Sequence, residues 1–116
     1  ITGCGAGNEY ISVVPNGDIY PCHQFVGKEE FILGNINDEE IVIPENIKSM
    51  FRNAHVYNKE SCKKCWNKFY CSGGCHANAI NFNGDITKPY DLGCEMQKKR
   101  TECAIMIQAK LLTEGE

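Results

Sequence analysis

Seven of the eight cysteines in this chain are spaced in a way that could bind metal. They are Cys4, Cys22, Cys62, Cys65, Cys71, Cys75 and Cys94, and the middle four follow C-x2-C-x5-C-x3-C spacing. Thiolate is the ligand that iron-sulfur clusters use, and a cubane cluster takes about four of them. A fold that gathers Cys62, Cys65 and Cys71 must therefore take a fourth thiolate from elsewhere. The spacing favours an iron-sulfur framework, and Cys103 lies outside the pattern.

Two other uses of the cysteines stay open on spacing alone. Cys62-x2-Cys65 is a common half-site for tetrahedral Zn²⁺. A second C-x2-C pair is absent, so Cys71-x3-Cys75 would have to replace it. Disulfides are typical of short secreted chains with even numbers of cysteines, but no hydrophobic signal-peptide region is present. Zinc is the main alternative to iron-sulfur, and it could occupy the same thiolates in a sample prepared in air.

A β-hairpin is predicted to place the first two cysteines near each other. Residues 8–14 alternate in part between apolar and polar, and the turn residues that follow contain Asn16-Gly17. Asn-Gly between two alternating runs is a strong hairpin signal, with Gly17 supplying a positive φ. The hairpin would carry Cys22 back toward Cys4. Residues 31–43 indicate another short strand followed by an acidic turn.

Helices are predicted for much of the remaining chain. Residues 44–54 favour a helix with Ile47, Met50 and Phe51 on its core face, because these positions follow i, i+3, i+4 spacing. The glycine pair 73–74 gives the backbone freedom to wrap a cluster before residues 76–82 resume helical character. Residues 94–112 form a last predicted helix, with Cys103 on its apolar side as a buried free thiol.

Three aromatic residues and two histidines lie beside the cysteines in the sequence. Trp66, Phe69 and Tyr70 are expected to shield a cluster from water or to belong to the core. His23 and His76 each follow a cysteine directly, so they could hydrogen-bond near a cluster or be plain structural residues.

Length and composition favour one small domain, residues 1–116. Leu, Ile, Val and Phe are only slightly more frequent than in disordered chains, so the apolar core is thin and needs support from metal or covalent links. The net charge of −3 disfavours nucleic-acid binding, and no run of residues could span a membrane. We expect a cytoplasmic α+β domain, with an N-terminal β-hairpin and short strands followed by helices, organised around two metal clusters.

The segments CGAGNEYISVVPNGDIYPC (4–22) and SCKKCWNKFYCSGGCHANA (61–79) resemble the SPASM domain. This domain is the cluster-bearing C-terminal extension of radical SAM enzymes that modify peptides and proteins. Gly17 and Cys22 match the Gly-x4-Cys step of the family pattern. The segments CSGGCHANA (71–79) and CEMQKKRTECAIMIQAKL (94–111) are most similar to those of maturases that install thioether cross-links in cysteine-rich ribosomal peptides.

The resemblance implies two auxiliary [4Fe-4S] clusters. It assigns the distal cluster to Cys62, Cys65, Cys71 and Cys94, and the proximal one to Cys4, Cys22 and Cys75. Cys75 would thus tie the two sites into one rigid unit. The fourth ligand of the proximal cluster is left open between a cysteine upstream of Ile1, Cys103, and a thiolate of the substrate.

The resemblance also implies partners that this chain does not contain. The Cys-x3-Cys-x2-Cys motif that binds the cluster for S-adenosylmethionine cleavage is missing, since His76 and Ala77 follow Cys75 without a third cysteine in register. We expect a radical SAM barrel in the same polypeptide, which binds S-adenosylmethionine, and a ribosomally made precursor peptide or protein as substrate. Alone, this C-terminal segment should have no turnover.

Overall fold

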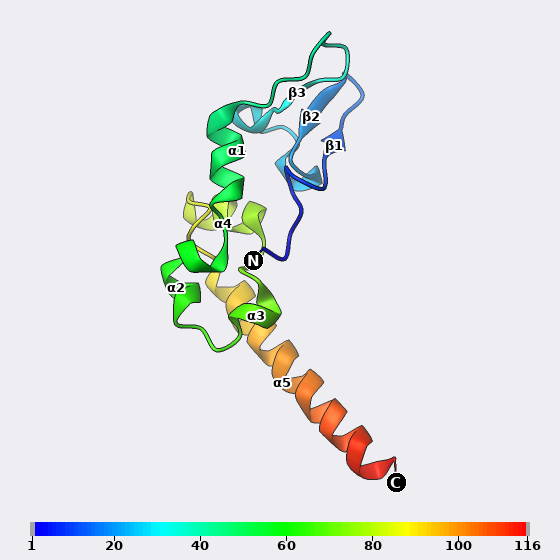
Figure 1. The fold of residues 1–116 in the computed structure, drawn as a ribbon, viewed down its shortest axis with the longest axis vertical. Coiled ribbons are helices and arrows are strands. Elements are labelled where there is room, and N and C mark those ends of the chain that lie inside the picture. The colour runs from blue at the N-terminus through cyan, green and yellow to red at the C-terminus, as the bar shows by residue number, and fades with distance from the viewer. Residues whose placement is uncertain (1, 116) are drawn as a thin grey trace.

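The computed structural model describes residues 2–115, which run from a small N-terminal sheet to a long C-terminal helix (Figure 1). Strands β1 (Ser12–Val13), β2 (Asp18–Tyr20) and β3 (Gly34–Asn35) form one antiparallel sheet in the order β1-β2-β3. Val13 pairs with Ile19, and Ile19 pairs with Gly34. The predicted hairpin is therefore confirmed, with Gly17 at φ +93° in its turn.

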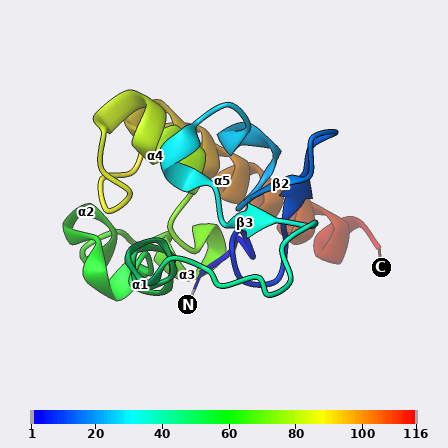
Figure 2. The ribbon, with the colours of Figure 1, turned by 90° about the horizontal axis from the view of Figure 1, so that it is seen from above.

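Five α-helices follow the sheet within residues 2–115, which confirms a mixed α+β architecture. They are α1 (Glu45–Arg52), α2 (Glu60–Lys63), α3 (Lys68–Cys71), α4 (His76–Asn83) and α5 (Asp91–Glu114). Single 3-10 turns lie at His23–Phe25, Glu29–Phe31 and Val56–Asn58. Seen from above, α1 and α4 lie on opposite sides of the body (Figure 2).

The core is a cluster of aromatic rings beneath the sheet and α1. The ring centroid of Phe25 lies 4.6 Å from that of Phe31 and 5.5 Å from that of Phe51. Ile47 and Phe51 are buried and Met50 is partly buried, as the spacing of the α1 sequence predicted. Burying such a side chain contributes about 1.5–3 kcal/mol. This core holds the start of α4 and the segment around Cys22 in fixed positions.

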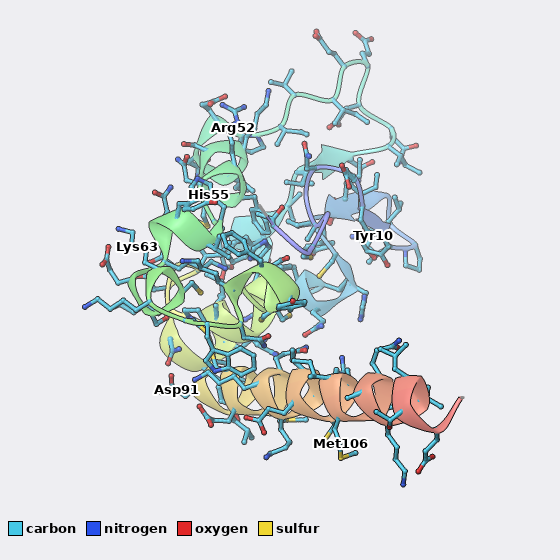
Figure 3. All side chains as sticks on the ribbon, turned by 60° about the horizontal axis from the view of Figure 1, so that its bottom comes forward. Tyr10, Arg52, His55, Lys63, Asp91 and Met106 are labelled. Carbon is cyan, nitrogen blue, oxygen red and sulfur yellow. The ribbon has the colours of Figure 1, made fainter. Side chains whose placement is uncertain are left out.

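Helix α5 projects from this body, which gives the molecule extents of 61 × 31 × 20 Å. Residues 102–115 are all exposed, and Figure 3 shows side chains such as Met106 extending freely from this half of the helix. Cys103 is exposed too, so the prediction of a buried thiol is wrong, because this residue lies on the half of α5 whose described residues are all exposed. No helix in residues 2–115 has both the length and the apolar character needed to cross a bilayer.

Candidate metal centre

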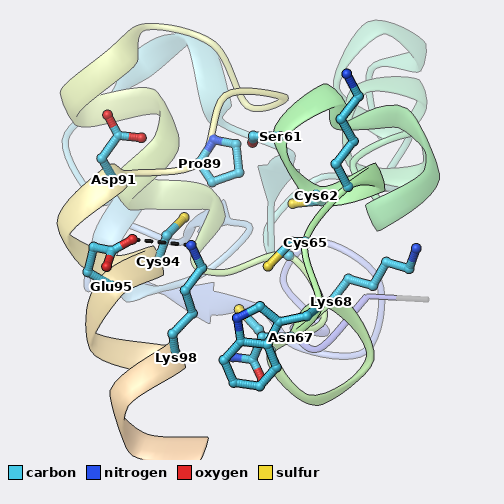
Figure 4. Close-up of a pocket in the computed structure, with 14 residues that line it drawn as sticks. Ser61, Cys62, Cys65, Asn67, Lys68, Pro89, Asp91, Cys94, Glu95 and Lys98 are labelled. Carbon is cyan, nitrogen blue, oxygen red and sulfur yellow. Dashed lines mark hydrogen bonds and ion pairs between the residues drawn. The ribbon is translucent and has the colours of Figure 1, made fainter. Parts of the chain in front are cut away.

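Four of the predicted ligand cysteines line one cavity of about 350 Å³ between α2, α3 and the start of α5. They are Cys62, Cys65, Cys71 and Cys94. Figure 4 shows the sulfur atoms of Cys62, Cys65 and Cys94 pointing toward a common space. We call this space the four-cysteine cavity.

Short hydrogen-bonded turns place these sulfurs. The amide of Cys65 donates to the carbonyl of Cys62 at 3.1 Å, so the two residues of the C-x2-C pair occupy one tight turn. The amide of Cys71 donates to the carbonyl of Asn67 at 2.8 Å, and Cys71 is the last residue of α3. Cys94 lies in the first turn of α5, where its amide donates to Tyr90 at 3.0 Å. Residues far apart in the sequence thus face one space.

The remaining three predicted ligands line a second cavity of about 260 Å³, which we call the three-cysteine cavity. They are Cys4, Cys22 and Cys75. His23, Gln24 and His76 line it as well, and the side-chain amide of Gln24 donates to the Cys75 sulfur at 3.8 Å. Cys103 lines neither cavity. The structure therefore separates the seven cysteines into the same sets of four and three that the resemblance assigned.

Comparison with known proteins decides the family. The model of the SPASM iron-sulfur cluster-binding domain matches residues 4–66. The chain belongs to the SPASM domain family. A similar protein, described as uncharacterized, comes from Archaeoglobus fulgidus and is 32% identical over 103 residues. That match covers 85% of this chain and 24% of the relative, so the chain spans about a quarter of the relative's length.

The spacing of the thiols in this SPASM domain bears on the kind of metal it suits. Within residues 2–115, no three His, Cys, Asp or Glu side chains lie close enough together to hold one metal ion. A single Zn²⁺ would require four thiolates at about 2.3 Å from its centre. A [4Fe-4S] cluster instead spreads its thiolates over several irons, so it does not need them around a single centre.

A buried polar side chain in the four-cysteine cavity also fits an iron-sulfur cluster. Asn67 is 1% exposed and lines this cavity. Neither its Nδ2 nor its Oδ1 has a hydrogen-bond partner within residues 2–115. Leaving such a group unsatisfied costs about 1–3 kcal/mol. Sulfur atoms of a cluster accept hydrogen bonds, so the Asn67 amide has the chemistry to donate to one.

The histidines differ in their surroundings. His76 is 2% exposed, and its Nδ1 has no hydrogen-bond partner among the described residues. Burial lowers the pKa of His76 to about 4, and the nearby Lys59 charge adds to this effect. His76 is thus a neutral group in the wall of the three-cysteine cavity at physiological pH. His23 lines the same cavity from an exposed position.

Burial favours the protonated form of three of the cysteine thiols. Burial raises the pKa of Cys22, Cys62 and Cys94, and neighbouring cysteines raise it further. Lys59 opposes this effect at Cys62. Because the ligands must be deprotonated, metal binding to these thiols would release protons.

A five-residue stretch joins the two cavities, and we call it the bridge segment (71–75). It begins at Cys71 of the four-cysteine cavity and ends at Cys75 of the other. The three residues between them, Ser72, Gly73 and Gly74, all have positive φ, at 60°, 101° and 76°. These conformations turn the chain sharply enough for the two cysteines to face different spaces.

The aromatic prediction is only partly correct. Trp66 lines the four-cysteine cavity but is 55% exposed. Phe69 and Tyr70 are 55% and 75% exposed and line neither cysteine cavity, so their expected shielding role is wrong. Tyr70 instead lines a separate groove with residues of α5. Sequence reasoning also missed Asn67, whose place inside the C-x2-C-x5-C run was its only signal.

Proposed function

We propose that this SPASM domain is the auxiliary cluster domain of a radical SAM enzyme that modifies a peptide or protein. Cys62, Cys65, Cys71 and Cys94 would hold the distal [4Fe-4S] cluster, and Cys4, Cys22 and Cys75 the proximal one. The observation that carries the proposal is the division of these cysteines between two cavities, in the sets of the family pattern. The greater length of the relative is consistent with further domains in such an enzyme.

When bound, such clusters supply one-electron transfer and a Lewis-acidic iron. The chain's own residues position and surround them. The bridge segment (71–75) fixes the two sets relative to each other, and Asn67 offers an N–H to the four-cysteine cavity. His76 contributes a buried, neutral side chain to the three-cysteine cavity. Together these residues would exclude water on the inner side of each cluster.

The three-cysteine cavity is the proposed site of substrate binding. Three protein thiolates are one fewer than a [4Fe-4S] cluster takes. Cys103 lies on the exposed half of α5 and is absent from the cavity wall, which leaves a cysteine upstream of Ile1 and a substrate thiolate as candidates. Of these two we propose the substrate thiolate. A cysteine of the peptide held there would be deprotonated and oriented, as thioether formation requires.

A cysteine-containing peptide and its serine counterpart test the substrate part of this proposal. The protein is loaded anaerobically with iron and sulfide, reduced, and examined by EPR with each peptide. We expect the cysteine peptide alone to change one cluster signal and leave the other unchanged. The change should disappear in Cys4→Ala/Cys22→Ala and persist in Cys103→Ser. Equal effects of both peptides, or none from either, would contradict substrate ligation.

The alternative function is a structural zinc-binding interaction module, favoured only by the Cys62-x2-Cys65 half-site. It predicts a colourless protein that keeps zinc in the presence of iron and sulfide. Metal analysis of the same samples distinguishes the two.

A further inference from the structure

The ammonium group of Lys59 is buried behind the wall of the four-cysteine cavity. Lys59 is 0% exposed, and its Nζ donates a hydrogen bond of 2.9 Å to the carbonyl of Gly73. Gly73 lines the cavity whereas Lys59 does not. A Cβ at Gly73 would lie 3.1 Å from Nζ. The charge therefore reaches the cavity wall through the space that a glycine leaves, without entering the cavity as a ligand.

The described residues offer Lys59 no carboxylate partner. The ion pairs found in residues 2–115 do not include it. A buried ammonium without an anion is strongly destabilised. Burial lowers the pKa of Lys59, and negative charge on nearby cysteines opposes this. In order of decreasing effect these are Cys62, Cys71, Cys4 and Cys94.

These cysteines come from both sets. Cys62, Cys71 and Cys94 line the four-cysteine cavity, and Cys4 lines the other. Gly73, which accepts the Lys59 hydrogen bond, is the middle residue of the bridge segment (71–75). The backbone amide of Cys62 donates to the Lys59 carbonyl at 2.9 Å, which ties Lys59 to the start of α2. One cation is thus fixed beside the element that joins the two sites.

We propose that Lys59 is a buried counter-cation shared by both sets of cysteines, and that it raises the reduction potential of the clusters they hold. This inference rests on the proposed function for the presence of the clusters. Each cluster gains one negative charge when it takes an electron from an added reductant. A nearby fixed positive charge stabilises that reduced state, and low local dielectric strengthens the effect. The four-cysteine cluster should feel it more, because Gly73, which accepts the Lys59 hydrogen bond, lines the four-cysteine cavity and not the three-cysteine one.

Three substitutions separate the charge from the hydrogen bond and the packing. Lys59→Met keeps the length and removes the charge, Lys59→Gln keeps a donor without charge, and Lys59→Arg keeps the charge. Lys110→Met, on the exposed half of α5, serves as the matched surface control. The reduction potentials of the loaded proteins are measured by dithionite titration followed by EPR.

We expect Lys59→Met and Lys59→Gln to lower the potential of the four-cysteine cluster. At the midpoint of the parent protein, the ratio of oxidised to reduced cluster should rise at least tenfold, which is about 59 mV for a one-electron couple. The three-cysteine cluster should shift less. Lys59→Arg and Lys110→Met should stay close to the parent. Unchanged potentials in both uncharged variants would overturn the proposal, as would a shift confined to Lys59→Met, which would assign the effect to the hydrogen bond.

Iron and sulfide analysis of each variant covers the case in which a substitution at Lys59 prevents cluster binding. If the uncharged variants lose their clusters while Lys59→Arg retains them, the positive charge is required and the proposal is supported. If Lys59→Arg loses them too, Lys59 is a packing residue and the proposal fails. A parent protein that binds no iron would instead overturn the proposed function itself, independently of any Lys59 variant.

Discussion

Replacing Gly73 with alanine tests the fit between the bridge segment (71–75) and the buried ammonium of Lys59. A Cβ at Gly73 would lie 3.1 Å from Lys59 Nζ and 3.6 Å from a methyl group of Val56. The new methyl group must therefore push the ammonium by a few tenths of an ångström, which distorts its hydrogen bond to the Gly73 carbonyl. Gly74, the next residue, provides a matched control because it also has positive φ and a Cβ there meets nothing within 4 Å.

The expected losses follow from these contacts. Backbone strain in either variant costs about 1–3 kcal/mol of unfolding free energy, since φ is +101° at Gly73 and +76° at Gly74. Gly73→Ala also disturbs a hydrogen bond from a charged donor, an interaction that contributes about 1.5–3 kcal/mol. We therefore expect Gly73→Ala to be less stable than Gly74→Ala by about 2 kcal/mol.

Urea unfolding followed by far-ultraviolet circular dichroism measures this difference in anaerobic, loaded samples. With a slope of about 2 kcal/mol per molar, the midpoint for Gly73→Ala should lie roughly 1 M below that for Gly74→Ala. In a Lys59→Met background the difference between the two variants should shrink, because the displaced charge is gone. Equal midpoints in the Lys59 protein would refute a fixed ammonium beneath Gly73.

Three further predictions concern the core and the cysteines. Asn67→Leu should raise the unfolding free energy of the metal-free protein by about 1–3 kcal/mol, because it removes an unsatisfied buried amide. In the loaded protein the same substitution should make cluster loss faster, as measured by absorbance. Slower loss would contradict a hydrogen bond from Asn67 to the cluster. In the loaded protein, Ellman's reagent should titrate one thiol, which disappears in Cys103→Ser; additional reactive thiols would count against seven ligand cysteines. Phe25→Ala should lower the free energy of unfolding, measured in urea, by about 3–5 kcal/mol, because Phe25 is fully buried. Phe69→Ala should lower it by about 0.5 kcal/mol, because Phe69 is exposed. Comparable losses in the two variants would mean that the core is wrongly placed.

Local patterns in the sequence predicted the elements that carry the cysteines. The Asn16-Gly17 turn predicted the hairpin because Gly17 has a positive φ, a conformation that residues other than glycine rarely adopt. The spacing of Ile47 and Phe51 gave the buried face of α1 for the same local reason. The family pattern, rather than spacing, divided the cysteines into sets of four and three. The structure places those sets in separate cavities, while metal ligation by them stays a prediction.

Burial was harder to predict where it depends on distant contacts. Cys103 lies among apolar residues, but the body ends before that part of α5 and leaves the thiol exposed. Lys59 is a charged residue beside Glu60 and looks like part of a solvated turn in the sequence. It is buried, and its ammonium contacts the bridge segment (71–75) through a hydrogen bond between residues 14 positions apart. No local pattern contains that information.

The most direct test of the two-cluster account is iron and sulfide analysis of the anaerobically loaded protein, with EPR of the reduced sample. The account predicts about eight iron and eight sulfide per chain and two distinguishable cluster signals. About four iron and a single signal would contradict metal binding by the three-cysteine cavity in this chain. Tightly held zinc that iron and sulfide do not replace would contradict the iron-sulfur assignment of both cavities.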